Sequence, residues 1–336
     1  DFVIMGRSNS YMFITGPEVI KAVTGEAVSL EELGGPVVHA SKSGVAHLLA
    51  DNDAAAIELV KQLLSYLPQN NTEDPPAIAA YDAAGRMDDA LNEAVPCDES
   101  QPYDMLAVIG RIIDHDSFLE IQPDYAPNAV VGFARLDGYS VGIVANQPMV
   151  AAGVLDINAS DKIARFVRTC DAFNIPVITF VDCPGYLPGV AQEHDGIIRH
   201  GAKVIYAYCE ATVPKIAVIT RRAIGGAYLA LSSKQMRSDL VYAWPSAQIA
   251  VMGAEGAVRI LHRRELEQAA DREALEREFV RAYREAFFNP YKAADVGQID
   301  EVIEPRETRP RLIRALELLR TKVQQNPPKK HGLFPV

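Results

Sequence analysis

An internal repeat constrains the fold of this chain most, because two similar blocks in the same order predict two domains of one architecture. Residues Asp1–Val19 resemble residues Asp239–Val258. Each block predicts a strand, a turn, a second strand and then a glycine that opens a helix, Gly16 in one copy and Gly253 in the other. The glycine lies 15 residues after the start of the first block and 14 after the start of the second, so one residue of slack aligns them.

Later blocks extend the repeat in the same order. Glu32–His39 matches Asp295–Val302, and an amphipathic helix is predicted after each, over 51–66 and 310–323. This block begins 42 residues after the helix-opening glycine in the second copy, against 16 in the first. The additional residues, 263–288, are charged and have a helical pattern, so they predict an insertion in the second copy.

A glycine turn precedes the second copy. The apolar run Lys215–Thr220 predicts a strand, Gly225-Gly226-Ala227 predicts a tight turn, and Leu229–Lys234 predicts a helix. Such a turn directs backbone N–H groups at a ligand oxygen, and the start of a helix adds partial positive charge. The turn contains no acid, base or nucleophile. It therefore predicts a site that holds an oxyanion.

The repeat also predicts the domain organisation. Gly225 lies 14 residues before the second copy, so the first copy should have its own glycine turn at the same spacing before Asp1. We expect residues 1–70 to be the C-terminal part of one domain whose front is absent, and 101–336 to be a complete second domain. Residues 71–100, rich in Pro, Asn, Asp, Glu and Ala, are expected to form an interdomain linker on the surface. Because the chain begins without a methionine, we expect a cut or processed N-terminus.

The second domain alternates strands and helices, which favours an α/β core with parallel pairing. Strands are predicted at 129–134, 140–146 and 176–181, and helices over 161–173 and 195–209.

The loop after the third of these strands, Asp182-Cys183-Pro184-Gly185-Tyr186, allows several interpretations. GTPases also have a strand that ends in Asp-x-x-Gly, but the phosphate-binding GxxxxGK[ST] motif is missing here. Gly185 could add a second N–H donor to the same oxyanion. Alternatively, the loop is a sharp turn that proline makes rigid. The residues alone leave these last two open.

Composition excludes several function classes. A net charge of −11 argues against nucleic acid as a partner. Four cysteines without a CxxC pair argue against a zinc or disulfide scaffold and suggest reduced thiols in a cytosol-like compartment. No metal-ligand spacing links the histidines, so no metal is expected. The absence of GxSxG makes a serine hydrolase an unsuitable assignment, and no apolar run approaches the ~18 residues of a membrane span.

The chain resembles the carboxyltransferase (β) subunits of biotin-dependent acyl-CoA carboxylases, those of propionyl-CoA carboxylase above all. The resemblance extends over essentially the whole chain. The segments that carry it are Tyr11–Pro17, Glu32–Gly35, Ser43–His47, Val131–Arg135, Asn146–Pro148, Arg165–Arg168, Asp171–Pro176, Ile198–Lys203 and Lys330–Gly332.

The resemblance implies two crotonase-like (ClpP/crotonase superfamily) ββα-superhelix domains, the first incomplete here, each with one oxyanion hole. One hole stabilises the enolate of an acyl-CoA thioester and the other the ureido oxygen of biotin. The second-domain hole corresponds to Gly225, with Gly226 and Ala227 as the N–H donors, and Gly185 and Tyr186 would also contact biotin. Leu229 would line the acyl pocket, at a position where propionyl-CoA enzymes usually have Asp.

The implied reaction is carboxyl transfer from carboxybiotin to the α-carbon of a short acyl-CoA such as propionyl-CoA, by an enzyme of the ligase or transferase class. In this family the freed biotin nitrogen takes the α-proton, so no protein base is needed. This chain has no Ala-Met-Lys-Met segment for biotin attachment, so biotin would arrive on a biotin carboxylase or biotin carboxyl carrier subunit. Dimers that assemble into a hexamer and a cytoplasmic location (the mitochondrial matrix in a eukaryote) are expected, and the chain alone is expected to be inactive.

Three alternatives remain. A biotin-dependent decarboxylase or transcarboxylase subunit would use the same half-reaction. A catalytically incomplete assembly fragment belongs to a different class. A CoA hydratase or isomerase would need a carboxylate pair near the glycine turn, and none is evident.

Overall fold

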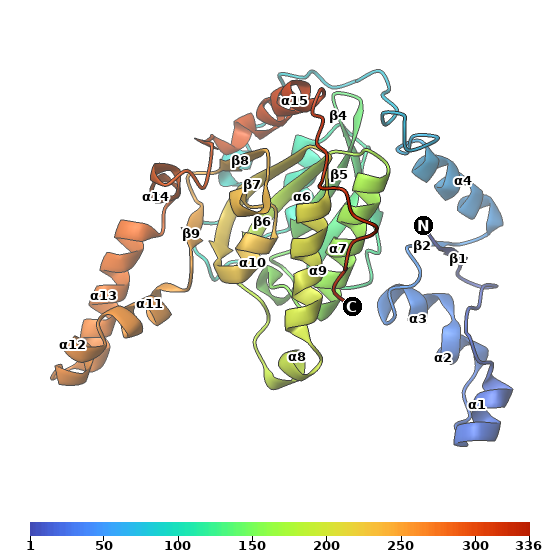
Figure 1. Cartoon of the computed structure of the whole chain (residues 1–336), viewed down its shortest axis with the longest axis horizontal. Coiled ribbons are helices and arrows are strands. Elements are labelled where there is room, and N and C mark those ends of the chain that lie inside the picture. Colours follow the sequence, from blue (N-terminus) through green and yellow to red (C-terminus); the bar gives the residue numbers. More distant parts are fainter.

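An eight-stranded sheet forms the centre of the computed structural model, which describes all residues 1–336 (Figure 1). Its strands run in the order β10 (Glu301–Val302), β8 (Leu240–Ala243), β7 (Lys215–Ile224), β6 (Val177–Cys183), β5 (Tyr139–Asn146), β4 (Ala129–Leu136) and β3 (Leu119–Ile121). The short strand β9 (Gln248–Ala250) also pairs with β7. Pairing is parallel from β10 to β5, and β5, β4 and β3 are antiparallel.

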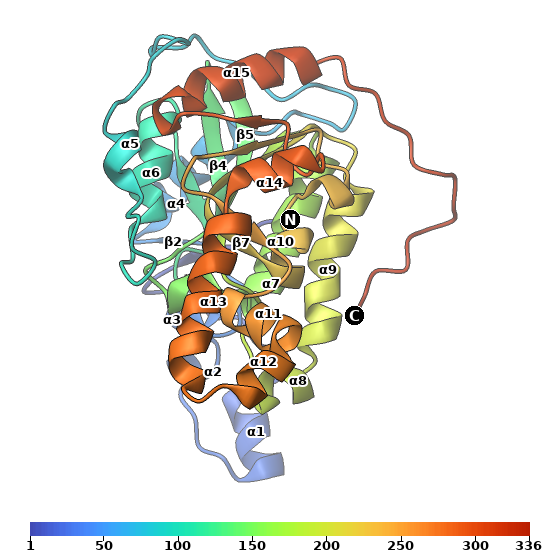
Figure 2. The same ribbon diagram turned by 90° about the vertical axis from the view of Figure 1, so that its left-hand side faces the viewer.

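Helices cover both faces of this sheet, as Figure 2 shows edge on. One face carries α7 (Ile157–Ala172), α9 (Ile197–Glu210) and α10 (Gly225–Ala230), and the other carries α5 (Leu91–Ala94), α6 (Met105–Ile112) and α15 (Thr308–Leu319). Side chains that alternate along a strand pack into the two layers in turn. On β4, Val131 and Phe133 join the α7–α9 core, whereas Val130 and Ala134 join the α6–α15 core. A strand buried on both faces explains the nearly continuous apolar runs in the sequence.

The predicted elements of the second domain are largely confirmed. The β4–β5 hairpin turns at Asp137 and Gly138, whose φ angles of 53° and 78° suit a tight turn. The helix predicted over Leu229–Lys234 is wrong. Helix α10 already begins at Gly225 and ends at Ala230, because the backbone leaves the helical conformation at Leu231 (ψ 71°) and again at Ser232 (φ 53°).

The repeat is confirmed at the level of topology. In the first copy β1 (Ile4–Gly6) pairs in parallel with β2 (Leu48–Ala50), and α4 (Asp53–Leu64) follows. In the second copy β8 pairs in parallel with β10, and α15 follows. After the glycine that opens each helix come α1 (Pro17–Thr24) and α11 (Ala254–Leu261). Figure 1 shows the first copy beside the large sheet, as a separate small layer.

Two details of the repeat prediction are wrong. Glu32–His39 does not correspond to the strand at Glu301–Val302, since Pro36–Ser41 is helix α3 and the equivalent of β10 is β2. The second strand predicted within Tyr11–Thr15 is not formed. Its counterpart β9 pairs with β7, and none of residues 1–336 takes the place of β7 beside β1. An extended segment without a partner strand has no ladder to join.

The linker and the insertion complete the fold. Residues 71–100 follow the surface as far as Asp89, but Leu91 in α5 then packs into the α6–α15 core. The remaining helices are α2 (Leu30–Gly34), α8 (Val190–His194), α12 (Arg263–Gln268), α13 (Arg272–Phe287) and α14 (Pro290–Asp295). None of the helices combines the length and apolar character needed to cross a membrane.

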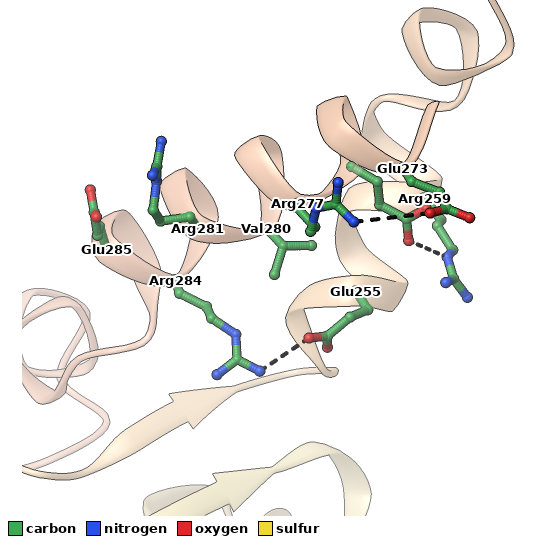
Figure 3. A pocket seen from close by; sticks show the side chains of 9 residues that line it. Glu255, Arg259, Glu273, Arg277, Val280, Arg281, Arg284 and Glu285 are labelled. Atoms are coloured by element: carbon green, nitrogen blue, oxygen red, sulfur yellow. Dashed lines mark hydrogen bonds and ion pairs between the residues drawn. The ribbon is translucent and has the colours of Figure 1, made fainter. Parts of the chain in front are cut away.

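The inserted helices form a charged groove of about 590 Å³ between α11 and α13 (Figure 3). Arg284 pairs with Glu255 at 3.1 Å and Arg259 with Glu276 at 2.6 Å. Acidic and basic side chains alternate along the groove, and α13 has no buried residue. The predicted charged insertion is confirmed. Its side chains face solvent and form ion pairs with one another.

Candidate functional site

Three parallel strands bring their carboxyl ends to one edge of the sheet. Strand β5 ends at Asn146, β6 ends just after Asp182, and β7 leads directly into Gly225. In α/β sheets ligands bind outside the carboxyl ends of the strands, because loops and helix N-termini gather there. The glycine turn and the Gly185 loop predicted from the sequence therefore belong to the same edge.

The glycine turn forms the first turn of α10. Gly225 has a φ of 68°, a conformation that side chains rarely adopt. Gly226 is not buried, and a Cβ there would meet no atom within 4 Å. Ala227 is fully buried, so its methyl group anchors the turn to the core. The N–H groups of these three residues have no intrahelical acceptor, and no side chain caps the helix. The open space at Gly226 is thus bordered by backbone donors.

A bulge in β7 lies immediately before the turn. Val181 of β6 pairs with Ile219 and Cys183 pairs with Ala223, so three residues of β7 face the single residue Asp182. A bulge of this kind leaves ladder groups without their regular partners. Asp182 compensates, because its Oδ1 atom accepts the backbone N–H of Arg222 at 3.2 Å.

Two arginine side chains close around the same carboxylate. Arg221 donates from Nε to Oδ2 of Asp182 at 3.0 Å, and Arg222 donates from Nε to Oδ1 at 2.7 Å. Asp182 is fully buried and the arginines are nearly so. Arg222 also donates to the carbonyl oxygen of Ala152 (2.9 Å), and Arg221 to that of Gln101 (3.0 Å). In the sequence, Asp182 stands out only as the first residue of an Asp-x-x-Gly pattern that GTPases share. The adjacent arginine pair on the next strand is the signal that would have identified this cluster.

The Gly185–Tyr186 loop is held by Leu155. The N–H of Leu155 donates to the carbonyl oxygen of Gly185 at 3.1 Å, and the N–H of Leu187 donates back to Leu155 at 2.8 Å. No backbone oxygen accepts the N–H of Gly185, which lies beside the Cys183 sulfur, and a Cβ at Gly185 would meet no atom within 4 Å. Tyr186 is directed the other way, since its hydroxyl donates to Gly201 of α9 at 3.4 Å.

One thiol and two phenols at this edge stay protonated at neutral pH. Burial raises the pKa values of the Cys183 thiol and of the Tyr186 and Tyr228 phenols, each to about 12. None of them can act as a base near neutrality. The chemistry available here is hydrogen bonding from backbone N–H groups.

The surface around the turn is open and apolar. Leu229, on the turn after Ala227, is 37% exposed, and Val251 and Met252 at the end of β9 are 77% and 38% exposed. Besides the charged groove, the chain has a cavity of about 470 Å³ between residues 74–77 and α15, and one of about 550 Å³ along α7, and none of them includes the turn. Exposed apolar side chains beside the start of a helix are typical of a surface that a ligand or another protein covers.

Comparisons with known proteins identify this architecture. The propionyl-CoA carboxylase carboxyltransferase subunit of Haloferax mediterranei is 57% identical over 336 residues, which are 100% of this chain and 65% of that protein. The methylmalonyl-CoA decarboxylase subunit alpha of Veillonella parvula is 53% identical over 336 residues, 100% of this chain and 64% of that protein. The chain thus spans slightly less than two thirds of the length of these relatives.

A solved structure agrees over the whole chain. The transcarboxylase 12S hexamer, crystallised with methylmalonyl-CoA and methylmalonic acid, superposes with a TM-score of 0.97 at 52% identity, covering 100% of this chain and 64% of that one. The expected α/β, crotonase-like fold is therefore confirmed. A family model described as the carboxyl transferase domain matches residues 1–334. The chain belongs to the carboxyl transferase domain family, as its sequence motifs predicted.

Proposed function

We propose that this chain supplies the biotin-facing half of a carboxyltransferase site in a longer protein. That protein would transfer a carboxyl group from carboxybiotin, carried on a partner, to the α-carbon of a short acyl-CoA such as propionyl-CoA. The observation that carries the proposal is the glycine turn, where the N–H groups of Gly226 and Ala227 have no intrahelical acceptor and border a space that a single Cβ at Gly226 would enter. The names of the relatives, which include a propionyl-CoA carboxylase subunit, support the substrate class.

Carboxybiotin supplies the carboxyl group, and the protein contributes donors. The N–H groups of Gly226 and Ala227 would hold the ureido oxygen, on which negative charge develops as the carboxyl group leaves. The N–H of Gly185 is a candidate for an additional donor, and the Tyr186 phenol would border the ring system. Each such donor contributes about 10²–10³ in rate in comparable oxyanion holes. The pKa values of Cys183, Tyr186 and Tyr228 are raised to about 12, so none of these side chains accepts a proton near pH 7. This is consistent with a reaction in which the protein itself moves no proton.

The remaining assignments extend the proposal to the whole protein. Residues 1–70, 71–100 and 101–336 would be the C-terminal part of a first domain, a linker and a second domain. A biotin carboxylase or biotin carboxyl carrier subunit would be the partner, and dimers would assemble into a hexamer, the assembly that the transcarboxylase 12S protein forms. We place the protein in the cytoplasm, or in the mitochondrial matrix of a eukaryote.

A methyl group at position 226 tests the proposal directly. Gly226→Ala has space for its Cβ, so the fold is retained, but the methyl group occupies the ligand position. Gly110→Ala is the matched control, because Gly110 is exposed, its Cβ would also meet no atom within 4 Å, and it lies on α6 away from the turn. In the full-length protein we expect Gly226→Ala to lower the carboxyl transfer rate to propionyl-CoA by about 10²–10³ and Gly110→Ala to leave it unchanged.

Two results would count against the proposal. Transfer by Gly226→Ala at the wild-type rate would remove the glycine turn from the site. A wild-type full-length protein that assembles with its partner but transfers no carboxyl group would instead favour the assembly-fragment alternative.

A decarboxylase or transcarboxylase subunit is a second candidate, because relatives of both kinds match over the entire chain. The partner discriminates between them. Co-purification with an ATP-dependent biotin carboxylase supports a carboxylase, whereas co-purification with a membrane sodium pump supports a decarboxylase.

A further inference from the structure

Strand β7 changes its neighbour on one edge just before the glycine turn. Its residues Ile216–Ile219 pair with β8, whereas Arg222–Ile224 pair with β9. The change occurs across the bulge that faces Asp182, and Gly225 follows two residues after Ala223 regains its pairing with Cys183. The direction in which β7 leaves the bulge therefore determines where the N–H groups of the turn point.

Asp182 is the group that holds the bulge in its bent form. It accepts the backbone N–H of Arg222 and the Nε atoms of both Arg221 and Arg222. No other carboxylate contacts these arginines, whose remaining acceptors are backbone carbonyl oxygens. Without this carboxylate the two buried guanidinium groups would have no counter-ion and would repel one another.

Neighbouring side chains hold Thr220, the first residue of the bulge, but they do not set the direction in which β7 leaves the bulge. Thr220 donates from Oγ1 to the carbonyl oxygen of Val181 at 3.1 Å and lies 3.0 Å from the hydroxyl of Tyr103. Ser246 donates to the carbonyl oxygen of Thr220 at 2.8 Å. These contacts anchor the start of the bulge, whereas only Asp182 holds both the N–H and the side chain of Arg222, where the pairing with β9 begins.

We propose that Asp182 is a positioning residue that aims the N–H groups of Gly226 and Ala227 by holding the β7 bulge closed. It lies beside the bulge that precedes the turn and is fully buried, so it would act through β7 rather than by contact with a ligand. Its catalytic consequence rests on the proposed function. A displacement of about 1 Å in a catalytic donor can lower a rate on the order of 10²-fold, so a group that sets this direction strongly affects turnover.

The structural part of the proposal is tested on this chain with [¹⁵N]glycine labelling. We expect Asp182→Asn, which keeps the shape of the side chain and removes its charge, to shift the amide signals of Gly225 and Gly226. Asp171→Asn is the matched control, because the Asp171 carboxylate also accepts backbone N–H groups (Thr212 at 2.7 Å, Val213 at 3.2 Å), at the amino end of β7. The control should leave both signals in place.

A second variant covers the case in which Asp182→Asn does not fold. Arg222→Met removes one guanidinium and leaves a neutral pair of Asp182 and Arg221, so it creates no unpaired buried charge. It should shift the same two glycine signals. Unchanged Gly225 and Gly226 signals in a folded Asp182→Asn or Arg222→Met protein would overturn the proposal.

Kinetics of the full-length protein test the catalytic part. We expect Asp182→Asn to lower kcat for carboxyl transfer on the order of 10²-fold with KM for acyl-CoA unchanged, and Asp171→Asn to retain wild-type kcat. A wild-type kcat in Asp182→Asn, or an increase in KM alone, would contradict a positioning role. If the wild-type protein transfers no carboxyl group, the proposed function fails, while the glycine signals still decide whether Asp182 positions the turn.

Discussion

Arg309 of α15 donates from Nη2 to Oδ1 of Asp114 at 2.7 Å, in the interior where the C-terminal helix meets the β4–β5 hairpin. The exposed fraction of Arg309 is 1%. Asp114 also accepts the backbone N–H groups of Asp137 (3.1 Å) and Gly138 (2.7 Å) in the hairpin turn. A single buried ion pair therefore connects the last helix of the second repeat to the antiparallel end of the sheet.

Removal of one partner of this pair should destabilise the fold strongly. Arg309→Met leaves the buried Asp114 carboxylate without a cation, and we expect the free energy of unfolding to fall by about 3–5 kcal/mol. Arg263→Met is the control, since Arg263 pairs with Glu267 on the exposed surface of α12 and such pairs contribute about 0–1 kcal/mol. Urea denaturation of both variants provides the comparison. Equal losses would show that burial does not distinguish the two pairs.

Acid should weaken the contact between the first repeat and α7. The ring nitrogens of His47 face two N–H donors, the backbone of Val3 (3.1 Å) and Nε of Arg165 (3.2 Å), so a protonated ring has no acceptor here. Burial and the charge of Arg165 lower the pKa of His47 to about 4, from an ordinary value of 6.5.

Between these pH values the unfolded state binds more protons than the folded state. The free energy of unfolding should therefore fall as the pH decreases from 6.5 to 4, by up to about 3 kcal/mol from this group. His47→Gln should show a smaller decrease over the same range, measured by urea denaturation at a series of pH values. Parallel pH profiles for the two proteins would rule out His47 as the source.

The two glycines of the turn should respond differently to alanine. Gly225 has a φ of 68°, so Gly225→Ala should cost about 1–2 kcal/mol of stability through backbone strain alone. Gly226 has no such constraint and an open surrounding, so Gly226→Ala should cost little stability while it blocks the site. Thermal unfolding of the two variants, read together with transfer activity, separates the effects. A stability loss at Gly226 as large as that at Gly225 would contradict this division.

Leu229 should influence the preferred acyl chain. We expect Leu229→Asp in the full-length protein to shift the kcat/KM ratio between propionyl- and butyryl-CoA by at least about tenfold, since one methylene in a pocket is worth about 1–3 kcal/mol. Leu318→Asp on α15 is the control, because Leu318 is likewise exposed but far along the chain from the turn. The ratio is measured with acetyl-, propionyl- and butyryl-CoA. An unchanged ratio in Leu229→Asp would remove this residue from the acyl pocket.

Local patterns predicted the elements with strong periodicity and failed where pairing depends on distant residues. The β4–β5 hairpin and helices α7 and α9 followed from apolar spacing and turn residues, and α13 followed from the charged helical pattern of the insertion. The strand expected within Tyr11–Thr15 did not form, because strand formation requires a partner edge that local sequence does not encode. The start of α10 was misplaced because Gly225 and Gly226 were treated as a turn before the helix, whereas they form its first turn.

The local part of the candidate site could be predicted from the sequence, whereas the part that depends on strand pairing could not. Gly225, Gly226 and Ala227 are adjacent in sequence, so their local conformation could be inferred. The cluster of Asp182 with Arg221 and Arg222 depends on a pairing between residues about 40 positions apart and on the bulge between β6 and β7. Neither the register of two strands nor its interruption is encoded in a short motif.

The change of neighbour in β7 divides this strand into two parts whose backbone hydrogen bonds should open with different ease. Up to Ile219 the strand is hydrogen-bonded on its two edges to β6 and β8, which are central strands of the sheet, whereas beyond the bulge one edge is bonded only to the three residues of β9. Hydrogen exchange should accordingly be slowest before the bulge and faster from Arg222 onward, through openings that leave the sheet intact. Substitutions around the turn can therefore change the ligand contacts in the course of evolution while the hydrogen bonds of the central sheet stay intact.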